Sequence, residues 1–183
     1  DRVLQPDGVK MLQVEHGRSG CPINMTVELL GDRWSLVVLR DIMFGDRRRF
    51  RELLHHSEER IASNVLESRL KRMSDVGLLT RHGDPTHRQK VEYRLTEPAI
   101  QLVPVMVQLG EWGARLLPAA AELAVRAELL ADGGPELWSR FMSELREVHL
   151  RGGTFSEDGV LAELTAAYDR VASAQGALRG RRQ

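Results

Sequence analysis

Apolar residues recur at helical spacing through most of the chain, with glycine or proline between the helical segments. In the first part of the chain this pattern predicts helices over 22–30, 34–44, 50–55 and 62–76. The last of these has Leu66, Leu70 and Met73 on one side and polar residues on the other, and Gly77 ends it. The second segment is apolar almost all round, so we expect it to be a central, buried helix.

After Gly77 the pattern changes to alternating apolar and polar residues, which predicts a β-hairpin. Its expected strands cover 78–82 and 91–95, and the long polar link between them should project as a basic loop. Thr96 is expected to cap a helix that continues to Leu116, and further apolar stripes predict helices in the rest of the chain.

This order of elements predicts a winged helix-turn-helix, a mainly α fold with a small β-hairpin wing (α+β) and additional C-terminal helices. Three regions are expected: a flexible N-terminal arm over 1–20, the winged helix-turn-helix over 21–117, and a C-terminal helical extension over 118–183. The first region is taken as an arm because it shows no periodicity and contains three glycines.

The formal net charge is zero, but the charges are unevenly distributed along the chain. Residues 47–94 contain 12 Lys or Arg against 7 Asp or Glu, whereas residues 95–183 contain 9 against 12. A basic segment beside an acidic one is typical of a DNA-contacting module with a non-contacting partner region. Solvated surface charge would give the same distribution, so charge alone does not decide between the two.

The polar side of the 62–76 helix and the hairpin loop 83–90 supply the candidate DNA contacts. A helix of this length fits the major groove, and the loop can reach the backbone or an adjacent minor groove. The basic residues can instead pair with nearby glutamates, which we expect for about half of them. The candidate DNA-binding residues are Arg49, Arg51, Ser63, Asn64, Glu67, Ser68, Lys71, Arg72, Thr86, His87, Arg88, Gln89 and Lys90.

Several short motifs follow one another through roughly half of the chain. They are CPI (21–23), LGDRW (30–34), LRDIMFG (39–45), RRFREL (48–53), RIASNVL (60–66), RL (69–70), GLL (77–79), VEYRLT (91–96) and LGEWG (109–113). Together they resemble the HxlR family of winged helix-turn-helix transcription regulators, which are related to the MarR proteins. One departure is Pro98-Ala99, where the family usually has a glycine after Leu-Thr-Glu.

The resemblance implies a sequence-specific regulator that binds double-stranded DNA as a homodimer, with an inverted-repeat operator. It makes 62–76 the recognition helix and 83–90 the wing. It also implies that two chains pair mainly through the N-terminal region and the helix expected over 96–116. The extension beyond residue 118 is longer than in a minimal member, so its role in dimerisation or effector binding stays open.

Cys21 is the only cysteine, which excludes an internal disulfide. It precedes a helix that begins with Pro22, and the unpaired backbone N–H groups there favour a thiolate. Some relatives in the resembled family sense oxidants or electrophiles at this position, which makes Cys21 a sensing candidate. The alternative is a small buried residue at a dimer interface.

Aromatic residues and methionine in the extension suggest a pocket for a small-molecule effector. The candidates are Trp138, Phe141, Met142 and Tyr168, with Phe155 nearby in sequence. Such stripes are more often ordinary core or dimer contact.

Other functional classes find little support in the sequence. It holds no phosphate-binding glycine loop, nucleophile elbow or metal-ligand spacing, so we expect no enzyme, cofactor or metal site. Without an apolar stretch of about 20 residues or a signal segment, we expect a cytoplasmic protein that does not cross a membrane. The remaining alternative is a winged helix that docks on protein rather than DNA. The polar and basic residues on the exposed face of the 62–76 helix and in the 83–90 loop favour DNA.

Overall fold

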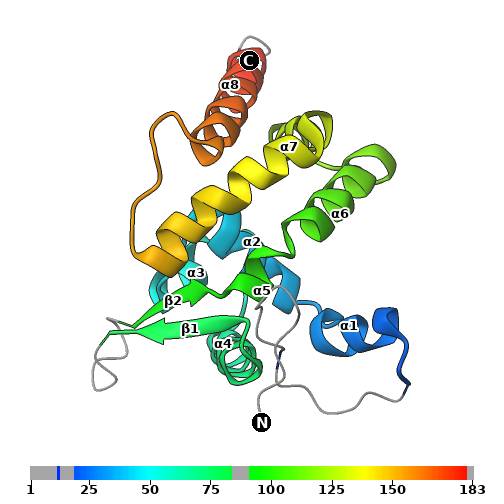
Figure 1. Ribbon diagram of the computed structural model, residues 1–183. Coiled ribbons are helices and arrows are strands. Elements are labelled where there is room, and N and C mark those ends of the chain that lie inside the picture. Colours follow the sequence, from blue (N-terminus) through cyan, green and yellow to red (C-terminus); the bar gives the residue numbers. More distant parts are fainter. Residues whose placement is uncertain (1–11, 13–18, 84–90, 181–183) are drawn as a thin grey trace. The chain divides into compact units, whose positions relative to one another are not determined.

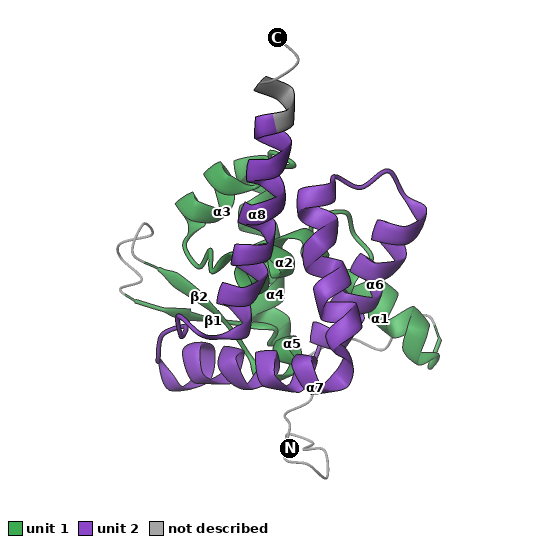
Figure 2. Cartoon of the chain, turned by 90° about the horizontal axis from the view of Figure 1, so that it is seen from above, with its two compact units in different colours: residues 1–100 green, residues 101–183 purple. Residues whose placement is uncertain are grey.

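The computed structural model describes residue 12 and residues 19–83 and 91–180, with side chains up to residue 177. The chain divides into two compact units, unit 1 over residues 1–100 and unit 2 over residues 101–183 (Figure 2). No helix in the described part of the chain is both long and apolar enough to cross a membrane.

Unit 1 has the element order predicted from the sequence (Figure 1). Its elements are α1 (Pro22–Leu30), α2 (Ser35–Gly45), α3 (Phe50–His56), α4 (Ser63–Val76), β1 (Leu79–His82), β2 (Glu92–Leu95) and α5 (Glu97–Ile100). Long helices follow in unit 2, so the predicted fold class, mainly helical with a two-stranded hairpin, is confirmed.

The core of unit 1 is built around α2, as its apolar sequence predicts. Leu39, Ile42 and Met43 are completely buried, and α2 packs against α3, α4 and β2. The helix begins at Ser35, and the carboxylate of Asp32 accepts the backbone N–H groups of residues 34 and 35 at 2.9 and 3.1 Å. Asp32 therefore satisfies donors that the first helical turn leaves unpaired.

The hairpin pairs β1 and β2 antiparallel, with Leu79 opposite Leu95 and His82 opposite Glu92. A short connection to the segment before α3 was not predicted. Arg49 forms an isolated antiparallel bridge with Glu92, and the N–H of Tyr93 donates to the carbonyl of residue 48 at 2.7 Å. The outer edge of β2 is thus tied to the start of the helix-turn-helix.

The prediction of a single helix from Thr96 to Leu116 was wrong, because this segment forms two helices. The chain forms α5, turns at residues 101 and 102, and begins α6 (Val103–Leu116). Pro104 lies in the first turn of α6, where its missing N–H costs nothing, whereas within one continuous helix its ring would clash with the carbonyl of Ile100. The Thr96 hydroxyl donates to the carbonyl of Gly77 at 2.7 Å instead of capping a helix.

Unit 2 consists of α6, α7 (Ala121–Arg151) and α8 (Val160–Gly180), and α7 packs against both of the others. A Cβ atom on Gly110 would lie 3.1 Å from the Cβ of Ala127, so the glycine permits a close approach of α6 and α7. Helix α7 bends at Gly134, whose φ of 58° and ψ of −162° are not helical. Pro135 follows, and the indole N–H of Trp138 donates across the bend to the carbonyl of Leu130 at 2.6 Å.

Candidate nucleic-acid interface

Helices α3 and α4 and the turn over 57–62 form the helix-turn-helix of unit 1. The two helices pack against each other, and α4 begins one residue after the predicted start. Leu53 of α3 and Leu66, Leu70 and Met73 of α4 are buried, which fixes the orientation of α4 about its own axis. The opposite side of α4 is therefore left exposed.

The exposed side of α4 is polar along its whole length. The exposed residues are Ser63, Asn64, Glu67, Ser68, Lys71, Arg72 and Asp75. They recur in pairs at intervals of four, which places them on one continuous face. We call this the α4 face, and it contains all six recognition-helix residues predicted from the sequence.

The side chains on the α4 face differ in whether they already have a partner within the protein, and Glu67, Lys71, Arg72 and Asp75 do. Lys71 pairs with Asp75 at 2.5 Å, and Arg72 donates to the backbone carbonyl of Glu28 at 2.7 Å. Within the described part of the chain, the side chains of Ser63, Asn64 and Ser68 form no hydrogen bond. Their donors and acceptors are free to bind another molecule.

The arginines before and within α3 are mostly held by acidic neighbours. Arg47 lies 3.4 Å from Asp41, Arg48 lies 2.8 Å from Asp46 and 2.6 Å from Glu92, and Arg49 lies 3.7 Å from Glu52. Arg51 is exposed and has no ion pair with another described residue. Of the two predicted contacts in this segment, Arg51 is the freer, while Arg49 pairs loosely and stays 58% exposed.

A network of charges anchors the turn between α3 and α4 to α2. The Arg40 guanidinium binds both oxygens of Glu59, at 2.5 and 2.8 Å, and also contacts Asp41 at 2.7 Å. The hydroxyl of the buried Ser57 donates to Glu59 at 3.3 Å. Hydrogen bonding from Arg40 lowers the pKa of Glu59 to about 2, whereas burial raises the pKa of Asp41.

Arg60 is a feature of this turn that was not among the predicted site residues. It is exposed, and its φ of 52° lies in the left-handed region that residues other than glycine rarely adopt. The sequence signal was present, since a basic residue stands directly before the recognition helix. It was missed because the turn conformation cannot be seen in the hydrophobic pattern.

The wing can be described only at its base. Gly83 follows β1 and Val91 precedes β2, whereas the predicted contacts Thr86, His87, Arg88, Gln89 and Lys90 lie outside the described residues.

Helix α6 in unit 2 exposes an apolar stripe. Val105, Leu109, Trp112 and Leu116 are 44%, 49%, 52% and 58% exposed. Their spacing of four, three and four residues places them on one side of the helix, and we call this the α6 stripe. Four large apolar side chains on one helix face are typical of a surface that a partner covers.

Cys21 is exposed and occupies the N-cap position of α1, directly before Pro22. The α1 side chains of Ile23 and Val27 are also exposed, at 76% and 57%. The thiol is therefore accessible, as a sensing role requires, but its reactivity stays a prediction.

The four predicted effector-pocket residues have structural contacts in unit 2. Phe141 is fully buried, Trp138 and Met142 are half-buried, and the Arg126 guanidinium lies 4.5 Å from the ring centre of Tyr168. The effector pocket they were expected to line stays a prediction.

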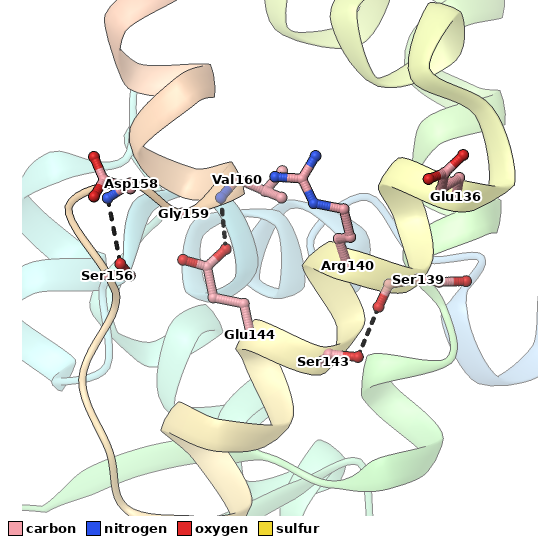
Figure 3. Close-up of a pocket in the computed structure, with 9 residues that line it drawn as sticks. All are labelled: Glu136, Ser139, Arg140, Ser143, Glu144, Ser156, Asp158, Gly159 and Val160. Carbon is pink, nitrogen blue, oxygen red and sulfur yellow. Dashed lines mark hydrogen bonds between the residues drawn. The ribbon is translucent and has the colours of Figure 1, made fainter.

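An open pocket of about 670 Å³ does occur between α7 and the start of α8, but none of these four residues lines it (Figure 3). Most of the residues that line it have polar side chains, among them Arg140 and Glu144. One oxygen of Glu144 accepts the N–H groups of Val160 and Leu161 at 2.9 and 3.3 Å, which caps α8. A Cβ on Gly159 would overlap the other oxygen, so a larger residue here would displace the Glu144 carboxylate.

The chain is similar in sequence to several HTH-type transcriptional regulators. An uncharacterised HTH-type transcriptional regulator of Mycobacterium tuberculosis is 36% identical over 105 residues, covering 57% of this chain and 65% of that protein. A second, from Halalkalibacterium halodurans, is 34% identical over 94 residues, covering 51% of this chain and 82% of that protein. The match thus spans slightly less than two thirds of the mycobacterial relative.

Among solved structures, the redox regulator HypR in its reduced form is 28% identical, with a TM-score of 0.45 over 52% of this chain and 92% of that one. Residues 29–121 match the HxlR-like helix-turn-helix family, a stretch that includes the helix-turn-helix, the hairpin and α6. The predicted resemblance is confirmed, and the family is one of regulators rather than enzymes. The chain belongs to the HxlR-like helix-turn-helix family.

Proposed function

We propose that this protein is a transcriptional regulator that binds double-stranded DNA sequence-specifically as a homodimer, with α4 in the major groove. The observation that carries the proposal is the α4 face, a continuous polar surface on the second helix of a helix-turn-helix. The major groove of B-DNA admits an α-helix, and the second helix of this motif is the one that enters it.

The chemistry of the α4 face suits both base and phosphate contacts. Asn64 offers an amide that can pair in two places with an adenine edge, and Ser63 and Ser68 can donate to or accept from either groove wall. Lys71 and Arg72 supply positive charge. The Lys71–Asp75 pair is exposed on both sides and worth about 0–1 kcal/mol, so a phosphate can displace Asp75 at little cost.

The first turn of α4 adds a further attraction for DNA. It holds no acidic residue, and no side chain caps it. The free backbone N–H groups and the positive end of the helix dipole therefore favour a phosphate nearby.

The α6 stripe supports a homodimer. Leaving Val105, Leu109, Trp112 and Leu116 in water is unfavourable, and a second copy that presents the same stripe would bury both. The resemblance to the HxlR family independently favours pairing through this helix and the N-terminal region. A symmetric dimer would present two α4 faces, which fits an inverted-repeat operator.

The wing over 83–90 is expected to contact the DNA backbone or minor groove, with Arg88 and Lys90 as its basic residues. Exposure of Cys21 supports a response to oxidants or electrophiles. The test is non-reducing electrophoresis after diamide treatment, in which the wild type should form a covalent dimer and Cys21→Ser should not. A wild type that forms no covalent dimer and keeps its affinity for DNA after the treatment would contradict redox sensing at Cys21.

Selection of duplexes from a random pool by the purified protein, near 0.15 M salt, tests the central proposal. Enrichment of an inverted repeat with half-sites about one helical turn, or a multiple of it, apart is the expected result. A folded protein that enriches no sequence would contradict it and would favour a winged helix that docks on protein.

A further inference from the structure

We infer that the turn between α3 and α4 is a phosphate-binding element, in which Arg60 contacts the DNA backbone and the Arg40–Glu59 pair holds it in position. The inference rests on the proposed function and adds a contact that neither the sequence motifs nor the family match assigns. Three observations carry it: the conformation of Arg60, its lack of an internal partner, and the anchoring of the residue beside it.

Arg60 adopts a backbone conformation that its side chain does not favour. Its φ is 52°, and its N–H donates to the carbonyl of Ser57 at 3.2 Å, so the left-handed residue closes the turn. Glycine and asparagine adopt this region at lower cost than arginine does. An arginine at this strained position is explained if its positive charge is needed to bind a phosphate.

The Arg60 side chain has no polar partner among the residues that the structure describes. It is exposed, and it takes part in no hydrogen bond, ion pair or ring contact with any other described residue. This separates it from Arg40, Arg47, Arg48 and Arg69, each of which pairs with a carboxylate. Its guanidinium is available to a phosphate, which arginine binds through two parallel hydrogen bonds.

Of the two acidic residues that precede Arg60, the adjacent one is already paired within the protein. Glu59 is held by both amino groups of Arg40, so its charge is balanced and its position fixed. Glu58 is exposed, the only acidic residue of the 57–62 turn besides Glu59. Arg60 lies three residues before Ser63, which begins α4, so its side chain starts from the end of α4 that the proposed function directs at DNA.

The test compares three variants of the full chain with the wild type on one selected duplex, across a series of salt concentrations. Arg60→Gln removes the charge, Arg60→Asn removes it and tolerates the left-handed backbone, and Arg60→Lys retains it. Arg170→Gln, at an exposed position on α8, is the matched control.

We expect Arg60→Gln and Arg60→Asn to flatten the salt dependence of log K by ~0.9 for each protomer that contacts DNA, and to raise Kd roughly fivefold per contact at 0.15 M salt. Arg60→Lys and Arg170→Gln should keep the wild-type slope. The Tm of both variants should stay close to that of the wild type, with Arg60→Asn equal to or above Arg60→Gln, which would show that binding is lost without loss of folding.

Wild-type slopes in both charge-removing variants would overturn the inference while leaving DNA binding intact. An equal loss in Arg60→Lys and Arg60→Gln would overturn it as well, because the contact would then not depend on charge. Absence of binding by the wild type itself would instead remove the proposed function, and the inference with it.

Discussion

Helices α4 and α6 are each fourteen residues long and each buries an apolar side, yet their exposed sides differ in kind. The α4 face consists of hydroxyl, amide and charged groups, whereas the α6 stripe consists of valine, leucine and tryptophan. Hydrophobic burial explains the apolar residues on the buried side of both helices. The exposed sides are what distinguish a surface suited to a polyanion from one suited to a second protein chain.

The largest expected effect comes from placing a charge on the α6 stripe. Trp112→Glu should raise the dimer dissociation constant at least 100-fold, equivalent to about 3 kcal/mol, because a buried unpaired carboxylate replaces a large aromatic contact. Sedimentation equilibrium measures the change. Ala166→Glu, which adds the same charge at an exposed position of α8, is the control and should leave the dimer intact. A wild type that is monomeric at all concentrations would refute the dimer.

A smaller effect is expected on the α4 face, where the change should depend on DNA sequence. Asn64→Ala should cost about 1–3 kcal/mol on the best selected duplex and much less on random DNA, if the amide reads a base. Fluorescence anisotropy at one salt concentration measures both affinities. Equal losses on the two duplexes would make Asn64 a backbone contact, and no loss on either would place it outside the interface.

The smallest effect is expected for the Arg40–Glu59 ion pair, which holds the turn between α3 and α4 to α2. Glu59→Gln should lower the free energy of unfolding by about 1 kcal/mol near neutral pH, a value reduced by the partial exposure of the ion pair. Because the folded-state pKa of Glu59, about 2, lies below its ordinary value of 4.5, its contribution is complete above pH 4.5. It should disappear as the pH falls from 4.5 towards 2.

Urea unfolding of both proteins at several pH values measures this difference. The difference in the free energy of unfolding between wild type and Glu59→Gln should shrink as the pH falls. All other carboxylates titrate in both proteins, so their effects cancel in this difference. A gap that does not change with pH would mean that the ion pair contributes little and that Gln disturbs packing instead.

The buried parts of the fold were predictable because their periodicity is strong. The recognition helix was expected over 62–76 and begins one residue later, and the central helix was expected over 34–44 and covers Ser35–Gly45. Both have complete apolar patterns and glycine near the C-terminal end. The polar α4 face followed directly from that periodicity, since fixing the buried side fixes the exposed one.

Features that depend on single residues or on distant contacts were missed. Pro104 splits the expected 96–116 helix, a signal that was present but outweighed by the apolar stripe. The bridge between Arg49 and Glu92 joins residues far apart in the sequence, and no local pattern encodes it. The capping of α8 by Glu144, from another helix, is equally invisible without tertiary structure. Ion pairing decides which arginines remain free, and only the folded chain shows the pairs.

Stoichiometry on DNA tests the central claim most directly, because it requires the α4 face and the α6 stripe to act together. The measurement is native mass spectrometry of the wild type with a duplex carrying the selected site. The account predicts two chains per duplex, and loss of the two-chain complex for Trp112→Glu on the same DNA. One wild-type chain bound per duplex at full affinity, or no complex at all, would contradict it.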